Sequence, residues 1–298
     1  METFREVFDP HFILRNSVYI SVAFGVTCPL VGVYLVLRRL VFMGVALPQI
    51  SSCGIAFAFA LQGWGLLPHI HDSAEEQTLA FLGSTVFTLA AILLLSLLAR
   101  RGHGSVEARV GTAYALAGAW SVLLLVKNPA GEHGLLDLLK GEIIAISDFE
   151  LGVTIGVFAL IIAALFLVQK EFLLVSFDRD MAVTLKKNVL TWDAFLFLLV
   201  GLTISMAVLS VGPLVTFGFL LLPPLTAHLF ARNMRQFALA AAALGGVTAL
   251  IGFCIAYRWD MPVGATDVAL LGLVYSLAFL GWKLYGLLRP KSRARTES

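Results

Sequence analysis

The sequence predicts an all-α polytopic membrane protein, built as a bundle of about nine transmembrane helices. The chain is 59% hydrophobic and only 13% charged, whereas soluble globular domains carry about 25% charged residues. Its mean hydropathy is +0.91. Apolar runs that reach the roughly 20 residues needed to cross a bilayer recur along the chain. Most of this protein is therefore expected to lie in lipid rather than in water.

Eight runs with almost no charge follow one another, at residues 17–37, 40–68, 78–99, 110–126, 151–168, 194–231, 237–257 and 262–282. The sixth is too long for one crossing, because as a single helix it would extend about 57 Å, roughly two bilayer cores. Its "VGPL" at 211–214 is the expected break, since Pro213 cannot donate to the helix ladder and Gly212 permits a turn. We count nine crossings, with eight plus a re-entrant segment as the alternative.

The basic residues predict the orientation of the bundle. Suppose that the segments after crossings one, three, five and seven lie on the same side of the membrane as the C-terminal tail. Sixteen of the 21 Lys and Arg residues are then on that side. Positive charge marks the cytoplasmic side of a membrane protein. We expect the N-terminus outside and the C-terminus inside. The domains are then an outer segment 1–16, one transmembrane domain 17–288 with a cytoplasmic loop 169–193, and a basic cytoplasmic tail 289–298.

The N-terminus and the cysteines carry no processing or redox signal. The first residues mix Glu2, Glu6 and Asp9 with Arg5, which is not the basic start of a cleaved signal peptide, so the first apolar run should stay in the protein. The three cysteines are widely spaced inside apolar runs and are expected to be packing residues.

Several function classes are excluded by what the sequence lacks. It contains no GxxxxGK[ST] phosphate loop, no HExxH and no dinucleotide fingerprint, and no soluble segment large enough for an ATPase. No paired carboxylates or catalytic triad fall within the runs, so we expect no catalytic residue and no enzyme. The formal net charge of +2 argues against nucleic acid as a partner.

Ionisable residues are scarce inside the runs, and Asp267 and His228 sit close to the ends of theirs. Carriers driven by a proton or sodium gradient usually place Asp, Glu or His near the middle of the membrane. The sequence thus favours a protein driven by a partner over an ion-coupled secondary carrier.

Small residues at four-residue spacing allow helix backbones to approach closely within lipid. Gly54 with Ala58 forms one such stripe, and Gly111, Ala115 and Ala119 form another. Either stripe fits packing within the chain, the simpler interpretation, or the interface of a dimer.

The longest cytoplasmic loop, "QKEFLLVSFDRDMAVTLKKNVLTWD" at 169–193, has the pattern of a short amphipathic helix around Met181, Val183 and Leu185. Acidic Asp178 and Asp180 precede that stretch and basic residues follow it, which suits a helix dipole. The loop is either a solvated connector or a docking helix that enters a groove on an ATPase.

Four stretches in this order resemble the manganese/zinc/iron-type permeases of bacterial ATP-binding-cassette (ABC) importers, over roughly residues 15 to 285. They are "VYLVLRRLVFMGVALPQISSCGIAFA" (33–58), "SFDRDMA" (176–182), "VGPLVTFGFLLLPPLTAHLFAR" (211–232) and "MPVGATDVAL" (261–270).

This resemblance implies a permease of the bacterial cytoplasmic membrane that works by alternating access as a homodimer. It implies a soluble metal-binding protein outside, a dimer of ABC ATPases inside that holds the ATP, and Zn, Mn or Fe ions as cargo, with no covalent cofactor. The residues it assigns to ATPase coupling are Phe177, Asp178, Arg179, Asp180, Met181 and Lys186.

The chain departs from the family at the position of the intramembrane metal ligands. Relatives show Gly-Asp after the paired arginines and a histidine four residues beyond the aspartate, which places both ligands on one helix face. Here Gly44 is kept, but Val45 and Gln49 stand at the two ligand positions. The glycine that usually ends the docking helix is also absent, with Lys186 and Lys187 near that place.

The resemblance places a polar notch of the second run on the translocation path. Its members are Gly44, Val45, Gln49, Ser51 and Ser52. Pro48 is expected to bend the helix so that polar side chains face a water-filled cavity. The alternative is that the serines and the glutamine hold helices together by hydrogen bonds.

An outer loop, "PHIHDSAEEQ" at 68–77, holds His69, His71 and Asp72. These residue types bind divalent metals, and the loop should face the side from which cargo is delivered. A metal-receiving site is one hypothesis, and an ordinary solvated loop is the other. For the whole chain, the alternatives to an ATP-driven importer are an ion-coupled carrier and a permease-derived scaffold that does not transport.

Overall fold

The structure is a computed structural model that describes residues 14–65, 73–100, 105–126 and 148–288. Throughout these ranges it is helical, without a β-strand, which confirms the all-α class. The described helices are α2 (Arg15–Leu37), α3 (Val41–Gly63), α4 (Ser73–Arg100), α5 (Val106–Val126), α7 (Asp148–Leu167), α8 (Gln169–Phe177), α9 (Arg179–Thr184), α10 (Val189–His228), α11 (Met234–Trp259) and α12 (Val263–Leu288).

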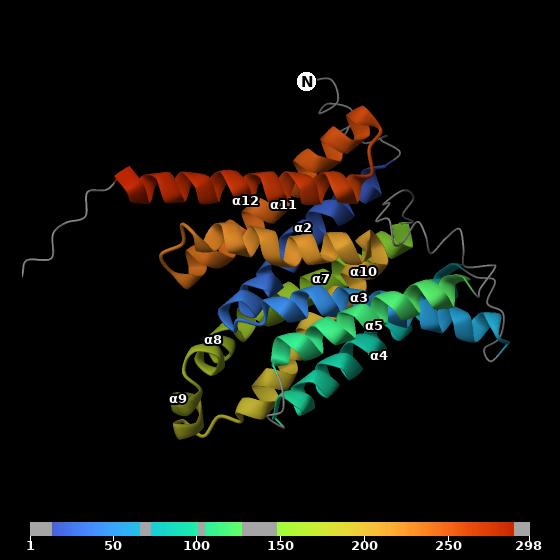
Figure 1. The fold of residues 1–298 in the computed structure, drawn as a ribbon, viewed down its shortest axis with the longest axis horizontal. Helices are drawn as coiled ribbons and strands as arrows, with labels where there is room; N and C mark the ends of the chain where they lie inside the picture. Colours follow the sequence, from blue (N-terminus) through green and yellow to red (C-terminus); the bar gives the residue numbers. More distant parts are fainter. Residues whose placement is uncertain (1–13, 66–72, 101–104, 127–147, 289–298) are drawn as a thin grey trace, which may run out of the picture.

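Eight of the described helices are long and apolar enough to cross a membrane: α2, α3, α4, α5, α7, α10, α11 and α12. They follow the eight apolar runs of the sequence in order, so the multi-pass membrane fold is confirmed. In Figure 1 they lie side by side as one bundle, and the short helices α8 and α9 stand at its lower left.

Helix α10 contains the break that the sequence predicts. It spans 40 residues, and Gly212 inside it has the non-helical angles φ 78° and ψ 168°. That region of backbone space is open essentially only to glycine, and Pro213 follows at once. The ribbon of α10 changes direction partway along (Figure 1). Eight and nine crossings therefore differ only in whether the two parts of α10 are counted together.

Helix α2 lies at the centre of the bundle and touches two neighbours backbone to backbone. A Cβ added to Gly245 of α11 would collide with the carbonyl oxygen of Gly25, and one added to Gly25 would stand 2.8 Å from the Cβ of Ala249. The second neighbour is α10: a Cβ added to Gly32 of α2 would collide with the carbonyl oxygen of Leu220. The glycines let these helices approach, as expected where lipid is as apolar as the side chains.

One of the two small-residue stripes packs against a neighbouring helix and the other is exposed. Gly54 and Ala58 of α3 pack against Gly83 of α4, where a Cβ on Gly83 would lie 2.7 Å from the Cβ of Ala58. The other stripe, on α5, does not pack against the described part of the chain. Nothing lies within 4 Å of a Cβ built on Gly111, and Ala115 and Ala119 are exposed.

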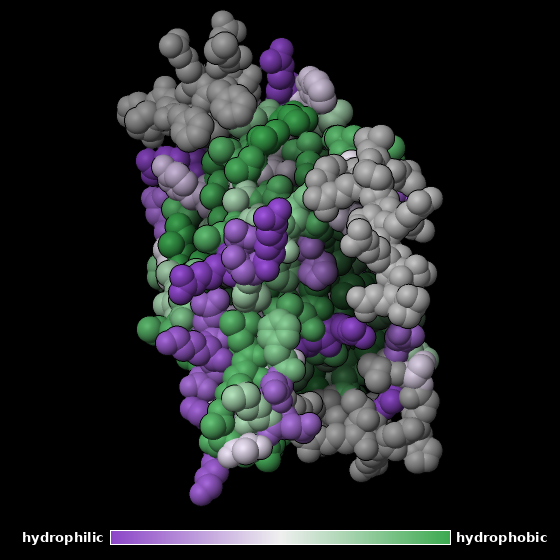
Figure 2. All heavy atoms as spheres, turned by 90° about the vertical axis from the view of Figure 1, so that its left-hand side faces the viewer, coloured by the Kyte–Doolittle hydropathy of each residue, from purple (hydrophilic) through white to green (hydrophobic). Residues whose placement is uncertain are grey.

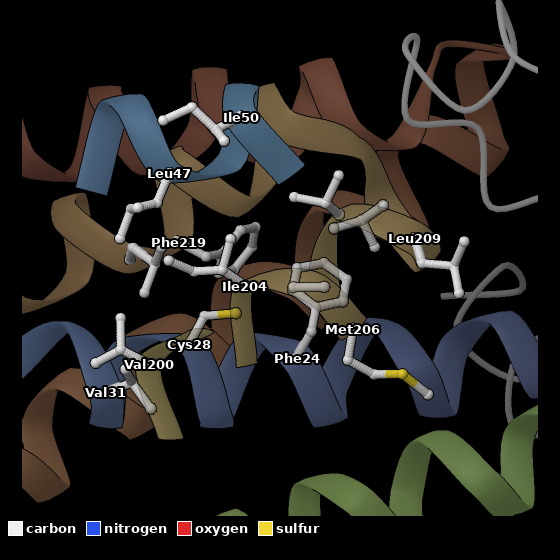
Figure 3. Close-up of a cluster of buried hydrophobic side chains, with 14 of the residues drawn as sticks. Phe24, Cys28, Val31, Leu47, Ile50, Val200, Ile204, Met206, Leu209 and Phe219 are labelled. Atoms are coloured by element: carbon white, nitrogen blue, oxygen red, sulfur yellow. The ribbon is translucent and has the colours of Figure 1, made fainter. Parts of the chain in front are cut away.

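The main hydrophobic cluster lies where α2, α3 and α10 meet. Figure 3 shows Phe24 and Cys28 from α2 beside Leu47 from α3 and Phe219 from α10. The rings of Phe24 and Phe219 meet edge to face, with centroids 4.8 Å apart. Helices α4, α5, α7 and α12 are mostly exposed, whereas α2 and α3 are mostly buried. The outer helices are thus available to lipid or to a second chain.

We predict that Gly245→Ala destabilises the protein, because the new methyl group must push α11 away from α2. Overpacking of this kind costs about 1–3 kcal/mol. The measurement is the thermal midpoint in detergent, with Gly152→Ala on α7 as the control, since nothing lies within 4 Å of a Cβ there. Equal midpoints for both variants would contradict the close contact.

Candidate functional site

The ligand positions Val45 and Gln49 lie on the face of α3 that is not fully buried. Both side chains are half-buried, whereas Gly44 is buried. A Cβ on Gly44 would sit 3.4 Å from a methyl group of Leu221 in α10. A Cβ on Gly118 of α5 would sit 3.5 Å from Nε2 of Gln49. This end of the notch therefore lies between α10 and α5, with the side chain of Gln49 next to α5.

The serines of the notch are placed differently from Gln49. Both Ser51 and Ser52 are buried. The hydroxyl of Ser51 forms a 2.6 Å hydrogen bond with the hydroxyl of Ser84 in α4. Ser84 in turn donates to the carbonyl oxygen of Ser205 in α10, at 3.4 Å. For Ser51 this is the geometry of a bond that holds three helices together, one of the two roles left open by the sequence.

The notch offers few ligands to a metal ion. Val45 has no donor atom, and Gln49 has one neutral amide oxygen. Nowhere in the described ranges do three or more His, Cys, Asp or Glu side chains converge on a possible metal position. His69, His71 and Asp72 lie outside the described residues, so the outer-loop hypothesis stays a prediction. A cation would thus meet a neutral surface at Val45 and Gln49.

The loop expected to dock on an ATPase contains the short helix that the sequence pattern predicts. α9 begins at Arg179 directly after Asp178, whose carboxylate accepts a 2.8 Å hydrogen bond from the backbone N–H of Met181. A side chain that accepts this bond satisfies one of the free N–H groups at a helix start. Asp180 lies in the first turn, where the helix dipole favours negative charge.

At the C-terminal end of α9, a lysine occupies the position where the family usually has a glycine. Lys186 has φ 56°, the left-handed conformation that glycine adopts most easily. The N–H of Lys186 bonds the carbonyl of Val183 at 2.9 Å, and the N–H of Lys187 bonds that of Ala182 at 3.0 Å. These two bonds define a Schellman motif. A lysine thus takes the glycine position and bears the steric cost of its Cβ.

α9 exposes apolar side chains to water alongside polar ones. Ala182 is completely buried, but Met181 is 51% exposed. The exposed apolar side chains around α9, called the α9 face below, are Phe177, Met181, Val183 and Leu185. Apolar side chains that gather on a surface mark sites of contact with other molecules. The docking role of this helix stays a prediction.

Sequence reasoning missed the contacts of Arg38, which joins segments far apart in the chain. Its Nη1 donates to Oδ1 of Asp193 at 2.6 Å, and its Nε donates to Oγ of Ser176 at 2.9 Å. A cavity of about 1030 Å³ lies beside this contact, between the α2–α3 turn, α4, α5, α8 and α10. The sequence pattern treats Arg38 and Arg39 alike, as charges at the end of a span. The one available signal is Asp193, an acidic residue at the start of an apolar run on the same predicted side.

Comparisons with known proteins find relatives that match nearly the whole chain. Residues 11–281 match the ABC 3 transport family. The manganese transport system membrane protein MntC of Listeria monocytogenes is 26% identical over 294 residues, which is 99% of each chain. The manganese transport system membrane protein MntD of Bacillus subtilis is 28% identical, covering 92% of this chain and 93% of its own.

Two solved structures share the fold. The structure of PsaBC from Streptococcus pneumoniae in complex with Fab gives a TM-score of 0.79 at 23% identity and covers 93% of this chain and 94% of its own. A metal-chelate type ABC transporter in an inward-facing conformation gives 0.68 at 16% identity and covers 92% and 90%. At these identities the likeness shows the fold alone.

We predict that Lys186→Gly stabilises α9, because glycine adopts the left-handed conformation without a Cβ penalty. The gain should be about 1 kcal/mol, or about fivefold slower hydrogen exchange of the amides that close the helix. Mass spectrometry of exchange over residues 179–187 measures it. Lys187→Gly is the control and should not slow exchange, since that residue has ordinary φ. Faster exchange in Lys186→Gly would contradict the assignment.

Proposed function

The chain belongs to the ABC 3 transport family, and on that premise we propose that it is the permease subunit of an importer for a divalent transition metal ion, with ATP hydrolysed on a separate partner chain. It is a multi-pass protein of the bacterial cytoplasmic membrane. The observation that carries the proposal is the match, over almost the whole chain, to relatives named as manganese transport membrane proteins. Among the family's metals, manganese is therefore the first to test, with iron and zinc as the next candidates.

The α9 face supports docking of an ABC ATPase dimer. Phe177, Met181, Val183 and Leu185 are exposed apolar side chains on and beside a capped helix that stands clear of the spans (Figure 1). An amphipathic helix binds a partner by laying such a face into an apolar groove. Force from a closing ATPase dimer would then reach the membrane helices through α8 and α10, on either side of α9.

This docking end is the cytoplasmic end in our proposal. The α2–α3 turn with its paired arginines, the turn between α10 and α11, and the C-terminal end of α12 all lie on the left in Figure 1, the same end as α9. Figure 2 looks onto that end and shows hydrophilic side chains spread over it among apolar ones. A concentration of basic residues on one side favours the cytoplasm, with the N-terminus outside.

The translocation path is proposed to run along α3 and α5 between two copies of the chain. Val45 and Gln49 are half-buried on α3, and α5, which Gln49 touches, exposes the stripe of Gly111, Ala115 and Ala119 on its surface. A second copy packed on that stripe would enclose the notch from both protomers. The notch is neutral, so a hydrated ion would pass it without a strong binding step, and a metal chelate would fit it equally well.

An extracytoplasmic binding protein would deliver the cargo in this scheme. The loop with His69, His71 and Asp72 follows α3 on the outer side, and it would take up the ion there. Alternating access then needs two states of the bundle, one open to each side, that ATP binding and release exchange. The break at Gly212 in α10 supplies a point where helices can reorient against each other.

The proposal is tested by uptake of manganese into liposomes that contain this chain with its ATPase and binding protein. We expect uptake that requires ATP. Met181→Lys should abolish both co-purification of the ATPase and uptake, because a charge in the α9 face opposes its burial in a groove. Leu284→Lys is the matched control, since it adds the same charge at a similarly exposed apolar site, 50% against 51%.

Two outcomes of that experiment would reject the proposal. Uptake by the chain alone, driven by a proton or sodium gradient, would identify an ion-coupled carrier. A stable complex that hydrolyses ATP but moves none of manganese, zinc or iron would identify a different cargo or a scaffold that does not transport.

One observation favours the ion-coupled carrier as a second candidate. Asp267 in α12 is completely buried, and neither carboxylate oxygen has a hydrogen-bond partner among the described residues. Its carboxylate lies directly against Gly252 of α11, where no Cβ could fit. An ionisable group inside a membrane span is a functional candidate by default, above all in proton or cation carriers.

Asp267→Asn separates the two candidates, because asparagine keeps the shape of the side chain and cannot ionise. As an importer, the protein should keep ATP-driven manganese uptake within about twofold, since the carboxylate lies outside the notch and away from the α9 face. As an ion-coupled carrier, it should lose gradient-driven flux completely. Uptake rates under ATP alone and under a proton gradient alone are the two measurements.

A further inference from the structure

We infer that Arg38 is the positioning residue that couples the ATPase-docking loop to the helices of the translocation path. This inference rests on the proposed function and names a connection within it. Three groups meet at the guanidinium: Oγ of Ser176 at 2.9 Å, Oδ1 of Asp193 at 2.6 Å, and the ring of Phe197, whose centroid lies 5.9 Å from Cζ. These contacts are called the Arg38 clamp below.

The clamp holds both flanks of the docking helix. Ser176 is the last residue but one of α8, and Asp193 lies in the second turn of α10. The segment between them contains α9. The two residues are 138 and 155 positions away from Arg38 in the sequence, so no local structure brings them to it. One side chain from another part of the chain thus joins both ends of the docking loop.

The other side of the clamp leads directly to the notch. Arg38 is the C-cap residue, directly after the last residue of α2, and Arg39 turns the chain with φ 57°. The N–H of Arg39 bonds the carbonyl of Val36 at 3.0 Å, and that of Leu40 bonds the carbonyl of Leu35 at 2.8 Å. Helix α3 begins at Val41. This closed turn makes the end of α2 and the start of α3 one body, with Gln49 about two turns further along.

Burial makes the clamp a firm connection. The side chains of Arg38 and Asp193 are only 11% and 12% exposed. Removal of one partner from a buried ion pair leaves the other charge without compensation, which is strongly unfavourable. The planar arginine fork directs two bonds from separate nitrogens to two partners, whereas lysine presents all its donors from one nitrogen. The clamp therefore resists separation of the loop from α2 and depends on arginine in particular.

A cavity borders the clamp. Its lining includes Arg38, Ser176, Asp193 and Phe197. Side chains that border a cavity of about 1030 Å³ are not held there by close packing. When α9 is pulled, the flanks of the loop have room to move, and the Arg38 bonds are the contacts that must follow or break.

The chain supplies a matched control for the ion pair. Nζ of Lys187 lies 3.0 Å from Oε1 of Glu171, with side chains 40% and 30% exposed. This pair ties the end of α9 back to α8 and does not involve α2. It is in the same loop and has the same charge types, but it links the loop only to itself. Its loss should leave coupling intact.

The test compares manganese moved per ATP hydrolysed in liposomes that contain the complete transporter. Arg38→Lys keeps the charge but not the double contact, and Arg38→Met with Asp193→Leu removes both charges together. We expect both forms to bind the ATPase and hydrolyse ATP, with the ratio lowered at least about fivefold. Glu171→Gln is expected to leave the ratio unchanged.

A second measurement distinguishes coupling from a purely structural role. Chemical labelling of a cysteine at position 49 reports movement of the path, and one at position 181 reports movement of α9. The three native cysteines are buried, which keeps the background low. In Arg38→Lys, ATP should still change the labelling at position 181 but no longer that at position 49.

The outcomes separate this inference from the proposed function. Normal manganese transport by the wild type, with an unchanged ratio in Arg38→Lys, would overturn the clamp alone. A wild type that shows no ATP-driven uptake would overturn the proposed function and the clamp with it. If Arg38→Lys fails to fold, the double variant without charges decides, and an unchanged ratio there would overturn the clamp.

Discussion

Close backbone contact at glycine is the constraint on which the rest of this structure depends. Inside a bilayer, burial of apolar side chains gives helices no reason to prefer each other over lipid. The contacts that remain specific are those where backbones touch, as at Gly25 with Gly245 and at Gly32 with Leu220. They place α2 between α11 and α10. Because α2 is fixed along its length, its C-terminal end is a firm base for the turn that carries Arg38.

From that base, the mechanical parts of the protein form one continuous series. The docking helix α9 is capped by Asp178 at its start and closed by Lys186 at its end. Its flanks are bonded to Arg38, and Arg38 is one short turn from α3. Val45 and Gln49 stand where the family resemblance leads us to expect metal ligands, whereas the contacts from the flanks of α9 through Arg38 to the start of α3 are continuous. This contrast fits a permease whose drive is retained and whose cargo site is neutral.

Polar residues within the spans divide into two groups with different physical roles. Ser51, Ser84 and Ser205 join three helices by hydrogen bonds, and such bonds are satisfied inside the protein and need no water. Within the described ranges, no such bond is formed by Gln49 or Asp267. Gln49 lies half-buried against α5, at the surface where a second copy would pack, and Asp267 is buried alone between α12 and α11. In our proposal Gln49 faces the path of the ion, and Asp267 matters only if the protein is an ion-coupled carrier.

Much of the fold follows from the sequence by itself. Hydropathy gave the helices in order, Gly212 with Pro213 marked the break in α10, and the acidic and basic ends of one loop indicated α9, because each of these features depends on neighbours along the chain. Only the tertiary structure decided that Ser51 binds another helix, that Gly54 is packed while Gly111 is open, and that Arg38 joins Ser176 and Asp193. In spans that are apolar on all sides, residue spacing shows which residues share a face but not which helix that face meets. That choice is made by contacts between separate helices, from 33 positions apart for Ser51 with Ser84 to 155 for Arg38 with Asp193.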